Sequence, residues 1–244
     1  MRREGKVALV TGANRGIGLA VAEGLAAQGF ITLIGARNVE QGQAVAQEIR
    51  SRAGEAHAVA LTITDDHSVG DAAATVGRDF GRLDVLVNNA AIKLEWHPSP
   101  PSLLPLDIVR ETYETNVFGT IRVIQAMLPL MLQAPSPRIV NMSSGLGSLT
   151  LATTEGTKYQ QRPLLSYNTA KAALNSVTVQ FANELRDTNI KINAADPGLT
   201  RTAMTKDTGR RTPEEAAVVA IRLATLPDDG PTGSFFDANG PLPW

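Results

Sequence analysis

The sequence predicts an α/β protein with a doubly wound parallel sheet of about seven strands and helices on both faces of that sheet. The first observation is a series of short apolar runs, at 7–10, 31–34, 58–61, 85–87 and 139–140. Continuous apolar runs are typical of strands that are covered on both faces. The second observation is that longer periodic segments separate these runs, among them 16–28, 38–52 and 66–80. Strand, helix and strand repeated in this way imply right-handed crossovers and a parallel sheet.

The length of the chain fits one domain. At 244 residues an α/β fold commonly forms a single unit, so we expect one domain over 1–244. A proline cluster follows the fourth predicted strand, with Pro98, Pro100, Pro101 and Pro105. Because this cluster lies inside the alternating pattern, we interpret it as a surface loop and not as a linker between domains.

Composition argues against several classes of protein. The net charge of −1 lacks the basic footprint of a nucleic-acid-binding protein. Cysteine is absent, which rules out disulfides, thiolate nucleophiles and cysteine-based zinc sites. The apolar run at 7–10 is too short for a signal peptide, and no run approaches the roughly 18 apolar residues of a membrane span. We therefore expect a cytoplasmic protein with no metal site and with neither nucleic acid nor membrane among its partners.

A glycine-rich turn, TGANRGIG at 11–18, joins the first predicted strand to a helical segment. Glycine lets backbone N–H groups approach a phosphate closely, because no Cβ stands in the way. The amino end of the following helix adds about half a positive charge that faces the ligand. A tight turn between a closely packed strand and helix has the same composition, so the turn alone leaves both interpretations open. The candidate phosphate-binding residues are Gly12, Asn14, Arg15, Gly16, Ile17 and Gly18.

Five further motifs follow this turn in order. They are VNNA at 87–90, TNVFG at 115–119, NMSS at 141–144, SYNTAK at 166–171 and INAADPG at 192–198. Together with the turn, this ordered set resembles the short-chain dehydrogenase/reductase family, from residue 6 to the end of the chain. The tail at 233–244 resembles the carbonyl-reductase-like branch of that family. The resemblance implies a single Rossmann-type domain, a nicotinamide cofactor, and hydride transfer to or from a carbonyl carbon.

The reduction of a ketone needs an acid at the oxygen, because negative charge grows there as hydride reaches the carbon. Tyr167 is the candidate: a free phenol has a pKa of about 10, and Lys171, four residues on and on the same helical face, would lower it. The resemblance implies that Tyr167 donates the proton, that Lys171 lowers its pKa and holds the nicotinamide ribose, and that Ser144 hydrogen-bonds the substrate oxygen. It also implies that Asn116 holds Lys171 through a water molecule.

Each of these side chains has an ordinary structural interpretation as well. A tyrosine and a lysine four residues apart occur on many surface helices, and serines at strand ends are commonly turn or cap residues. Tyr159 is the nearest competing phenol, but Pro163 stands where its lysine would be. Ser144 is preferred to Ser143 because in the family the serine precedes a small-residue turn that ends in glycine, here 145–147.

The end of the second predicted strand favours NADP(H) over NAD(H). A site for NAD(H) places a carboxylate there, whereas a 2′-phosphate needs cations. The chain has Arg37 and no carboxylate at this place, and the resemblance directs Arg15 to the same region. Arginine can hold two phosphate oxygens at once, although solvated surface arginines would look the same in the sequence. The other cofactor contacts that the resemblance implies are Thr62, Ile63, Asn89, Ala90, Tyr167, Lys171, Pro197, Gly198 and Thr202.

Three departures from the family pattern concern the surroundings of the site. An insertion at 149–165 lies before the tyrosine, where it shapes the pocket or alters subunit packing. Ala91 replaces a usual glycine, and Thr62 stands where an acidic residue often meets the adenine, with Asp65 further on. The pair WH at 96–97 either lines the mouth of the pocket or anchors the proline-rich loop.

The predicted function is NADPH-dependent reduction of a ketone or aldehyde to an alcohol, with a small carbonyl compound or alcohol as the partner. One alternative is a redox sensor that binds NADP(H) without turnover, although a sensor need not retain the acid. Another is a nucleotide-sugar epimerase, which needs a larger substrate region than the chain offers after Gly198. The resemblance implies a homo-oligomer, a dimer or tetramer, while some carbonyl-reductase-like members are monomers.

Overall fold

The computed structural model describes residues 5–96, 99–160 and 163–244. These residues form one eight-stranded sheet in the order β3-β2-β1-β4-β5-β6-β7-β8. Neighbouring strands from β3 to β7 are parallel, and β8 runs antiparallel to β7. The strands are β1 (Val7–Thr11), β2 (Ile31–Ala36), β3 (Glu55–Ala60), β4 (Val85–Asn88), β5 (Arg138–Met142), β6 (Lys191–Ala195), β7 (Ser234–Asp237) and β8 (Gly240–Pro241). The seven parallel strands match the predicted number, and the eighth adds two residues.

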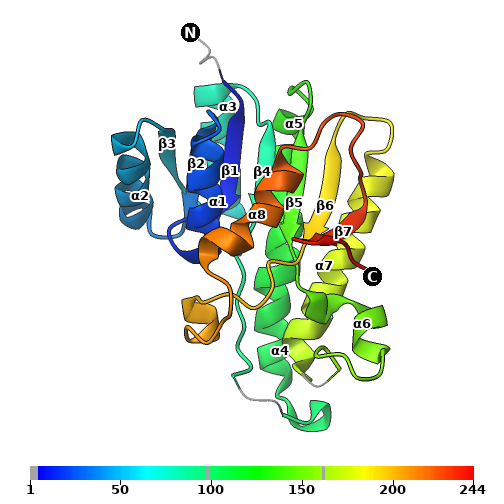
Figure 1. Cartoon of the computed structure of the whole chain (residues 1–244). Helices are drawn as coiled ribbons and strands as arrows, with labels where there is room; N and C mark the ends of the chain where they lie inside the picture. Colours follow the sequence, from blue (N-terminus) through cyan, green and yellow to red (C-terminus); the bar gives the residue numbers. More distant parts are fainter. Residues whose placement is uncertain (1–4, 97–98, 161–162) are drawn as a thin grey trace.

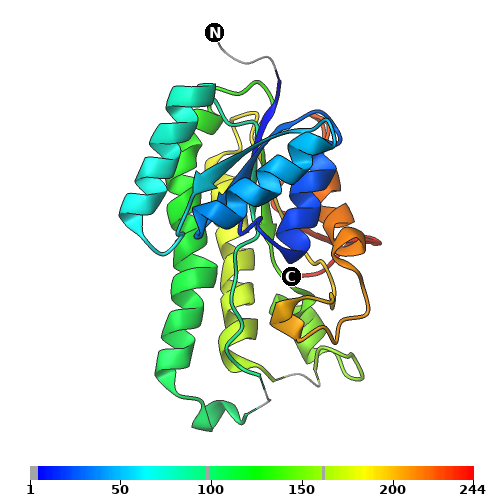
Figure 2. The same cartoon turned by 90° about the vertical axis from the view of Figure 1, so that its left-hand side faces the viewer.

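Helices cover both faces of the sheet, which confirms the doubly wound Rossmann-type architecture. They are α1 (Gly16–Ala26), α2 (Val39–Ser51), α3 (Asp66–Phe80), α4 (Leu106–Tyr113), α5 (Gly119–Met131), α6 (Leu149–Thr153), α7 (Leu165–Glu184) and α8 (Pro213–Ala224). Helices α1, α2 and α8 bury one apolar cluster against the sheet. Helices α3, α5 and α7 contribute to a second cluster on the opposite face. Figure 2 shows the sheet between these two layers.

The third strand begins and ends earlier than the predicted run at 58–61. β3 is an edge strand, paired on one side with β2, and Glu55 and Ala60 at its two ends are exposed. A strand with one free edge carries polar residues that face water. Apolar residues alone therefore mark only part of it.

The fifth strand is longer than the predicted run at 139–140 because it buries polar residues. Arg138 and Asn141 are 2% and 0% exposed. The guanidinium of Arg138 donates to the carbonyl oxygen of Leu226 at 2.9 Å, and the Asn141 amide donates to Thr178 Oγ1 at 2.9 Å. Hydrogen bonds to distant residues make the burial of these groups favourable, and a local apolar pattern does not reveal them.

The insertion at 149–165 begins with α6 and is joined to the end of the chain. The Thr150 N–H donates to the carbonyl oxygen of Trp244 at 3.0 Å. The ring of Trp244 stacks on Phe235 of β7, with centroids 5.5 Å apart. The C-terminal residue therefore fastens α6 to the last strands of the sheet.

Two predicted features lie partly outside the described residues. The proline-rich loop contains a 3₁₀ helix at Pro101–Leu103, whereas His97 and Pro98 are outside the described part, as are residues 161–162 of the insertion. Over the described residues, no helix combines the length and apolar character needed to cross a membrane.

Candidate active site

The motifs found in the sequence meet at one edge of the sheet, where the parallel strands end (the lower side in Figure 1). The glycine turn follows β1, the pair Asn89-Ala90 follows β4, Ser144 follows β5, and Pro197-Gly198 follow β6. The order of the strands reverses between β1 and β4: the chain builds the sheet outward from β1 to β3 on one side and from β4 to β7 on the other. Open α/β sheets bind ligands at this edge and at such a reversal, so the fold itself assembles the candidate site.

The glycine turn has the geometry of a phosphate-binding turn. Gly12 and Gly16 have φ of +64° and +57°, a region that glycine adopts without strain. A Cβ added to Gly18 would lie 2.6 Å from the carbonyl oxygen of Gly12 and 2.4 Å from Asn89 Nδ2. Glycine at these positions therefore lets the turn pack tightly against itself and the end of β4, and a tight turn before the amino end of a helix fits the diphosphate of a dinucleotide.

Asn89 and Ala90 brace the turn from the end of β4. The Asn89 side-chain amide donates to the carbonyl oxygens of Thr11 (2.9 Å) and Gly12 (3.3 Å). The backbone N–H groups of Asn89 and Ala90 donate to Thr11 Oγ1 at 2.9 and 3.0 Å. The Asn89 side chain therefore acts on the turn, and its predicted contact with the cofactor stays a prediction.

The other predicted residues of the turn differ in what their side chains do. The Asn14 amide donates to Gln41 Oε1 at 2.7 Å. Ile17 packs against the apolar cluster beneath α1, which leaves its backbone for a ligand. Arg15 is exposed and precedes the first turn of α1, so its cation stays available to an anion at the helix end.

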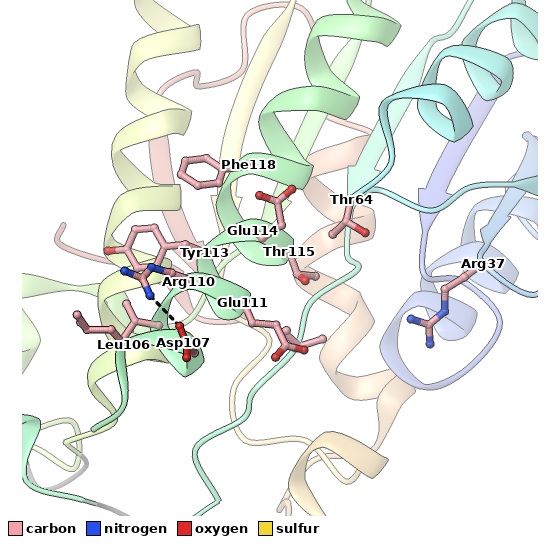
Figure 3. Close-up of a pocket in the computed structure, with 12 residues that line it drawn as sticks. Arg37, Thr64, Leu106, Asp107, Arg110, Glu111, Tyr113, Glu114, Thr115 and Phe118 are labelled. Carbon is pink, nitrogen blue, oxygen red and sulfur yellow. Dashed lines mark hydrogen bonds and ion pairs between the residues drawn. The ribbon is translucent and has the colours of Figure 1, made fainter. Parts of the chain in front are cut away.

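Arg37 lines a pocket of about 900 Å³ between the end of β2 and α4. Figure 3 shows Arg37 on one side of the pocket, the α4 side chains on the other, and Thr64 between them. Ser144, Tyr167 and Lys171 are not among its described lining residues. The pocket therefore lies at the end of β2, away from the place of proton transfer, and the contact of Arg37 with a 2′-phosphate stays a prediction.

The segment after β3 is held by local hydrogen bonds. The Thr62 N–H donates to Ser68 Oγ at 2.8 Å, and the carbonyl oxygen of Ile63 accepts from Arg122 at 2.9 Å. Asp65, considered for the adenine, instead accepts from the N–H groups of His67 and Ser68 at 2.9 and 3.2 Å and caps α3. The structure places Thr62 and Ile63 beside the Arg37 pocket through their neighbour Thr64.

Ser144, Tyr167 and Lys171 come together at the ends of β5 and α7. The side chains of Ser144 and Tyr167 are hydrogen-bonded to each other. Lys171 is 2% exposed; its Nζ lies 5.7 Å from the centroid of the Tyr167 ring and donates to the carbonyl oxygen of Met142 at 2.7 Å. Ser144 Oγ also accepts from the Leu146 N–H at 3.2 Å, because Ser144 caps the 3₁₀ helix that follows.

Burial dominates the proton affinities of this group. It raises the pKa of the Tyr167 phenol above its usual value, and the Asp196 carboxylate adds to the rise, while the hydrogen bond with Ser144 opposes it. The cost of burying a phenolate thus decides the direction of the shift, and the expected lowering of this pKa by Lys171 stays a prediction. Burial also lowers the pKa of Lys171 to about 8, against the attraction of Asp196. At neutral pH the phenol therefore holds its proton, as a donor must.

The structure supports the choice of Ser144 over Ser143. Ser143 is 3% exposed, and its hydroxyl donates to Asn175 Oδ1 at 2.5 Å on α7. Ser143 therefore joins β5 to α7. Ser144 is partly exposed and directed at Tyr167.

Asn116 lies in a π-helical segment, Glu114–Phe118, between α4 and α5 and is 1% exposed. Its side-chain oxygen accepts from the Ile92 N–H at 2.8 Å, and its amide donates to the Ile92 carbonyl oxygen at 2.9 Å. Both polar atoms of the side chain are thus engaged by the segment after β4. The water-mediated contact with Lys171 stays a prediction.

The loop after β6 lies over the glycine turn. A Cβ added to Gly16 would be 3.5 Å from Thr202 Cγ2. Gly198 has φ +73°, and its N–H donates to Asp196 Oδ1 at 2.9 Å. The Arg211 guanidinium donates to the Pro197 carbonyl oxygen at 3.3 Å, which ties the loop to the start of α8. Thr202 therefore lies beside the glycine turn, and the cofactor contacts of Pro197, Gly198 and Thr202 stay predictions.

The insertion reaches the site as well. A Cβ added to Gly145 would lie 2.5 Å from Tyr159 Cε1, so the Tyr159 ring packs on the glycine next to Ser144. Lys158 Nζ lies 4.8 Å from the centroid of that ring, and its charge favours the ionised form of Asp196. The insertion thus forms a wall beside Ser144.

Two residues with a part in the site had received no role from the sequence. Thr11 holds the ends of β1 and β4 together through its hydroxyl; the signal was a hydroxyl at the end of an apolar strand. Asp196 is 5% exposed, and burial raises its pKa above the usual range. The signal there was a carboxylate before a Pro-Gly turn at a strand end.

Comparisons with known proteins agree with this geometry. The model of the short chain dehydrogenase family matches residues 6–213. A short-chain dehydrogenase, anuI, of Penicillium roqueforti is 33% identical over 89% of this chain and 87% of its own. The (-)-isopiperitenone reductase of Mentha piperita is 30% identical over 95% of this chain and 96% of its own. A crystal structure of NADPH-bound carbonyl reductase from chicken fatty liver is 30% identical with a TM-score of 0.83, and each chain is covered to 100%. The chain belongs to the short-chain dehydrogenase/reductase family, whose members are oxidoreductases that use nicotinamide cofactors.

Proposed function

We propose that the protein reduces a ketone or aldehyde to an alcohol with NADPH and catalyses the reverse oxidation. The observation that carries the proposal is that the phenol of Tyr167 is hydrogen-bonded to Ser144 and that the centroid of its ring lies 5.7 Å from Nζ of Lys171. When bound, the reduced nicotinamide supplies hydride to the carbonyl carbon. The residues of the chain then act on the carbonyl oxygen.

Each of the three side chains has one task at that oxygen. The hydroxyl of Ser144 orients the carbonyl by a hydrogen bond, and Tyr167 donates its proton as negative charge grows there. Lys171 stabilises the phenolate that remains and binds the hydroxyls of the nicotinamide ribose. Its hydrogen bond to the Met142 carbonyl holds the ammonium beside the phenol. Asn116 holds Lys171 through a water molecule and thereby provides a route for the proton from solvent.

The preference for NADPH rests on Arg37 and Arg15. Both side chains are exposed, Arg37 lines the pocket at the end of β2, and no carboxylate stands in the segment 34–38. A carboxylate there would bind a ribose 2′-hydroxyl and repel a 2′-phosphate. The similarity to a carbonyl reductase solved with NADPH supports the same choice.

Three further parts of the proposal rest on composition and family. The whole chain, 1–244, acts as one catalytic domain, and the protein works in the cytoplasm, as the absence of cysteine allows. It assembles as a homodimer or homotetramer, which light scattering on a sizing column tests directly.

A panel of ketones, aldehydes and quinones, followed by the absorbance of NADPH, tests the proposal. We expect turnover of at least one carbonyl class with NADPH and a lower kcat/KM with NADH. Tight binding of NADPH with no turnover of any compound would instead indicate a redox sensor. Turnover of a sugar nucleotide alone would indicate an epimerase.

A further inference from the structure

Helix α7, which carries Tyr167 and Lys171, lacks a local cap at its amino end. Leu164 occupies the capping position, and its side chain cannot accept a hydrogen bond. The second and third N–H groups of the helix, those of Ser166 and Tyr167, instead donate to Glu95 Oε2 at 2.7 and 3.2 Å. The Ser166 hydroxyl donates to the same oxygen. Glu95 thus does what a capping Ser, Asp or Asn normally does, from 72 positions away in the sequence.

Several other helices of the chain are capped locally, whereas α1, α4 and α5 have no side-chain cap. Asn38 caps α2, Asp65 caps α3 and Thr212 caps α8, each from the position directly before its helix. A local cap suffices to satisfy the N–H groups of a helix end. The remote cap therefore has a second consequence, since it joins α7 to the segment after β4.

Three positions before Glu95, the same segment also contacts Asn116, another residue of the candidate site. Ile92 exchanges two backbone hydrogen bonds with the side chain of Asn116, while Glu95 holds the first turn of α7. The residue after Glu95 is Trp96, and the centroid of its ring lies 4.6 Å from Nζ of Lys206 in the loop after β6. One short stretch of chain thus contacts Asn116, the tyrosine helix and the loop over the glycine turn.

The burial of Glu95 argues against a role in stability alone. The residue is 4% exposed, and Oε1 has no hydrogen-bond partner among the described residues. A buried polar atom without a partner costs free energy. A shorter capping side chain directly before the helix would avoid that cost. The remote cap therefore costs stability, and its advantage lies in the position that it gives to the start of α7.

We propose that Glu95 is a positioning residue for the proton donor: its carboxylate fixes the first turn of α7 and with it the place of the Tyr167 hydroxyl relative to Ser144. The inference deepens the proposed function and rests on it for the part that concerns turnover. Tyr167 is the third residue of the helix, so a loosened first turn moves it directly. A misplacement of about 1 Å at a reacting group costs on the order of 10² in rate.

Two substitutions separate the accepting oxygen from the bulk of the side chain. Glu95→Met keeps the length and removes the acceptor, whereas Glu95→Gln keeps one accepting oxygen. We expect Glu95→Met to lower kcat by roughly 10- to 100-fold, with the dissociation constant of NADPH within about twofold of the parent because the cofactor turn lies elsewhere. Glu95→Gln should restore most of kcat.

The pH profile of alcohol oxidation distinguishes positioning from loss of folded protein. Burial raises the pKa of Tyr167, and the hydrogen bond with Ser144 lowers it, so a phenol that shifts away from Ser144 but stays buried ionises at higher pH. The profile of Glu95→Met should therefore shift to higher pH, and that of Glu95→Gln should lie near the parent profile. A smaller folded fraction would scale the rate and leave the profile unmoved.

Asp84 offers a matched control at the opposite edge of the sheet. It is 2% exposed and accepts from the Val7 N–H at 2.8 Å, 77 positions away. Asp84→Leu should lower the unfolding midpoint while kcat per folded molecule and the pH profile stay at parental values.

Hydrogen exchange gives a readout that needs no turnover. The amides of Ser166 and Tyr167 should exchange at least about tenfold faster in Glu95→Met and near the parental rate in Glu95→Gln and Asp84→Leu. Unchanged exchange in Glu95→Met, an unmoved pH profile, or no rescue by Glu95→Gln would each overturn the inference. If the parent protein turns over no carbonyl compound, the proposed function fails, and the exchange rates alone decide whether Glu95 holds the helix.

Discussion

Two buried cationic side chains, one at each end of β5, differ in their hydrogen-bond partners. At its start, Arg138 donates to the Leu226 carbonyl oxygen at 2.9 Å and pairs with Asp228 at 2.8 Å. Beyond its end, Lys171 is equally buried but donates to a carbonyl oxygen rather than a carboxylate. The contrast extends across the sheet. Asp84 at the amino edge is paired with Arg82, whereas two buried side-chain oxygens without a partner among the described residues, Asn88 Oδ1 and Glu95 Oε1, belong to the carboxyl edge.

This difference indicates what each edge is for. Paired buried charges and satisfied backbone groups stabilise the folded chain. A buried ammonium that donates to a carbonyl oxygen and not to a carboxylate, beside a phenol of raised pKa, is costly to the fold and useful for proton transfer. We therefore expect substitutions at the carboxyl edge to change chemistry and those at the amino edge to change stability.

The largest expected effect is that of Tyr167→Phe. The substitution removes the donated proton and keeps the ring, so the fold and NADPH binding should persist while kcat for ketone reduction falls by about 10²–10⁴-fold. Steady-state kinetics and a cofactor titration by fluorescence measure both. A variant that retains more than about a tenth of the parental kcat would show that another group donates the proton.

Lys171→Met should cost somewhat less, roughly 10² in kcat, and should also weaken NADPH binding, because one ammonium serves both tasks. The pKa of Lys171 is lowered to about 8 by burial, so its charge is lost as the pH rises through that value. The parental dissociation constant of NADPH should therefore increase above pH 8, while that of Lys171→Met stays level there. Equal pH dependence in both proteins would contradict the ribose-binding role.

Arg37→Asp tests the far end of the same edge. A charge-assisted hydrogen bond contributes about 1.5–3 kcal/mol, so two arginines on a 2′-phosphate correspond to a preference on the order of 10². The ratio of kcat/KM for NADPH to that for NADH should fall by about this factor, with NADH gaining in absolute terms. A parental ratio near one would refute the assignment of the cofactor.

Arg138→Met should have the smallest effect on activity. It removes the hydrogen bonds that the guanidinium donates to the backbone of Leu226 and Pro137, which corresponds to about 1–3 kcal/mol of unfolding free energy. Denaturant titration should show this loss, and kcat/KM should stay within twofold of the parent. A tenfold fall in kcat/KM at unchanged stability would remove the distinction between the two edges.

The sequence predicted the parallel sheet and the meeting of its motifs at one edge, because continuous apolar runs and glycine turns are local patterns. It pointed to Ser144, Tyr167 and Lys171 as one group, since a four-residue spacing on a helix and a strand end are also local; the three lie together in the structure, and their catalytic roles stay predictions. It did not reveal Glu95 or the full length of β5, because their hydrogen bonds join residues far apart in the chain. It did not reveal that burial raises the pKa of Tyr167, because burial is a property of the folded chain, and the lowering of that pKa by Lys171 stays a prediction.

The pH dependence of both reaction directions tests the central claim most directly. Ketone reduction needs the protonated phenol and should fall as the pH rises through the pKa of Tyr167, whereas alcohol oxidation needs the phenolate and should rise through the same value. Ser144→Ala should move that shared value upward, because the hydrogen bond with Ser144 lowers the pKa that burial raises. Two unrelated pKa values in the parent, or a shared value that Ser144→Ala leaves in place, would contradict proton transfer by Tyr167 beside Ser144.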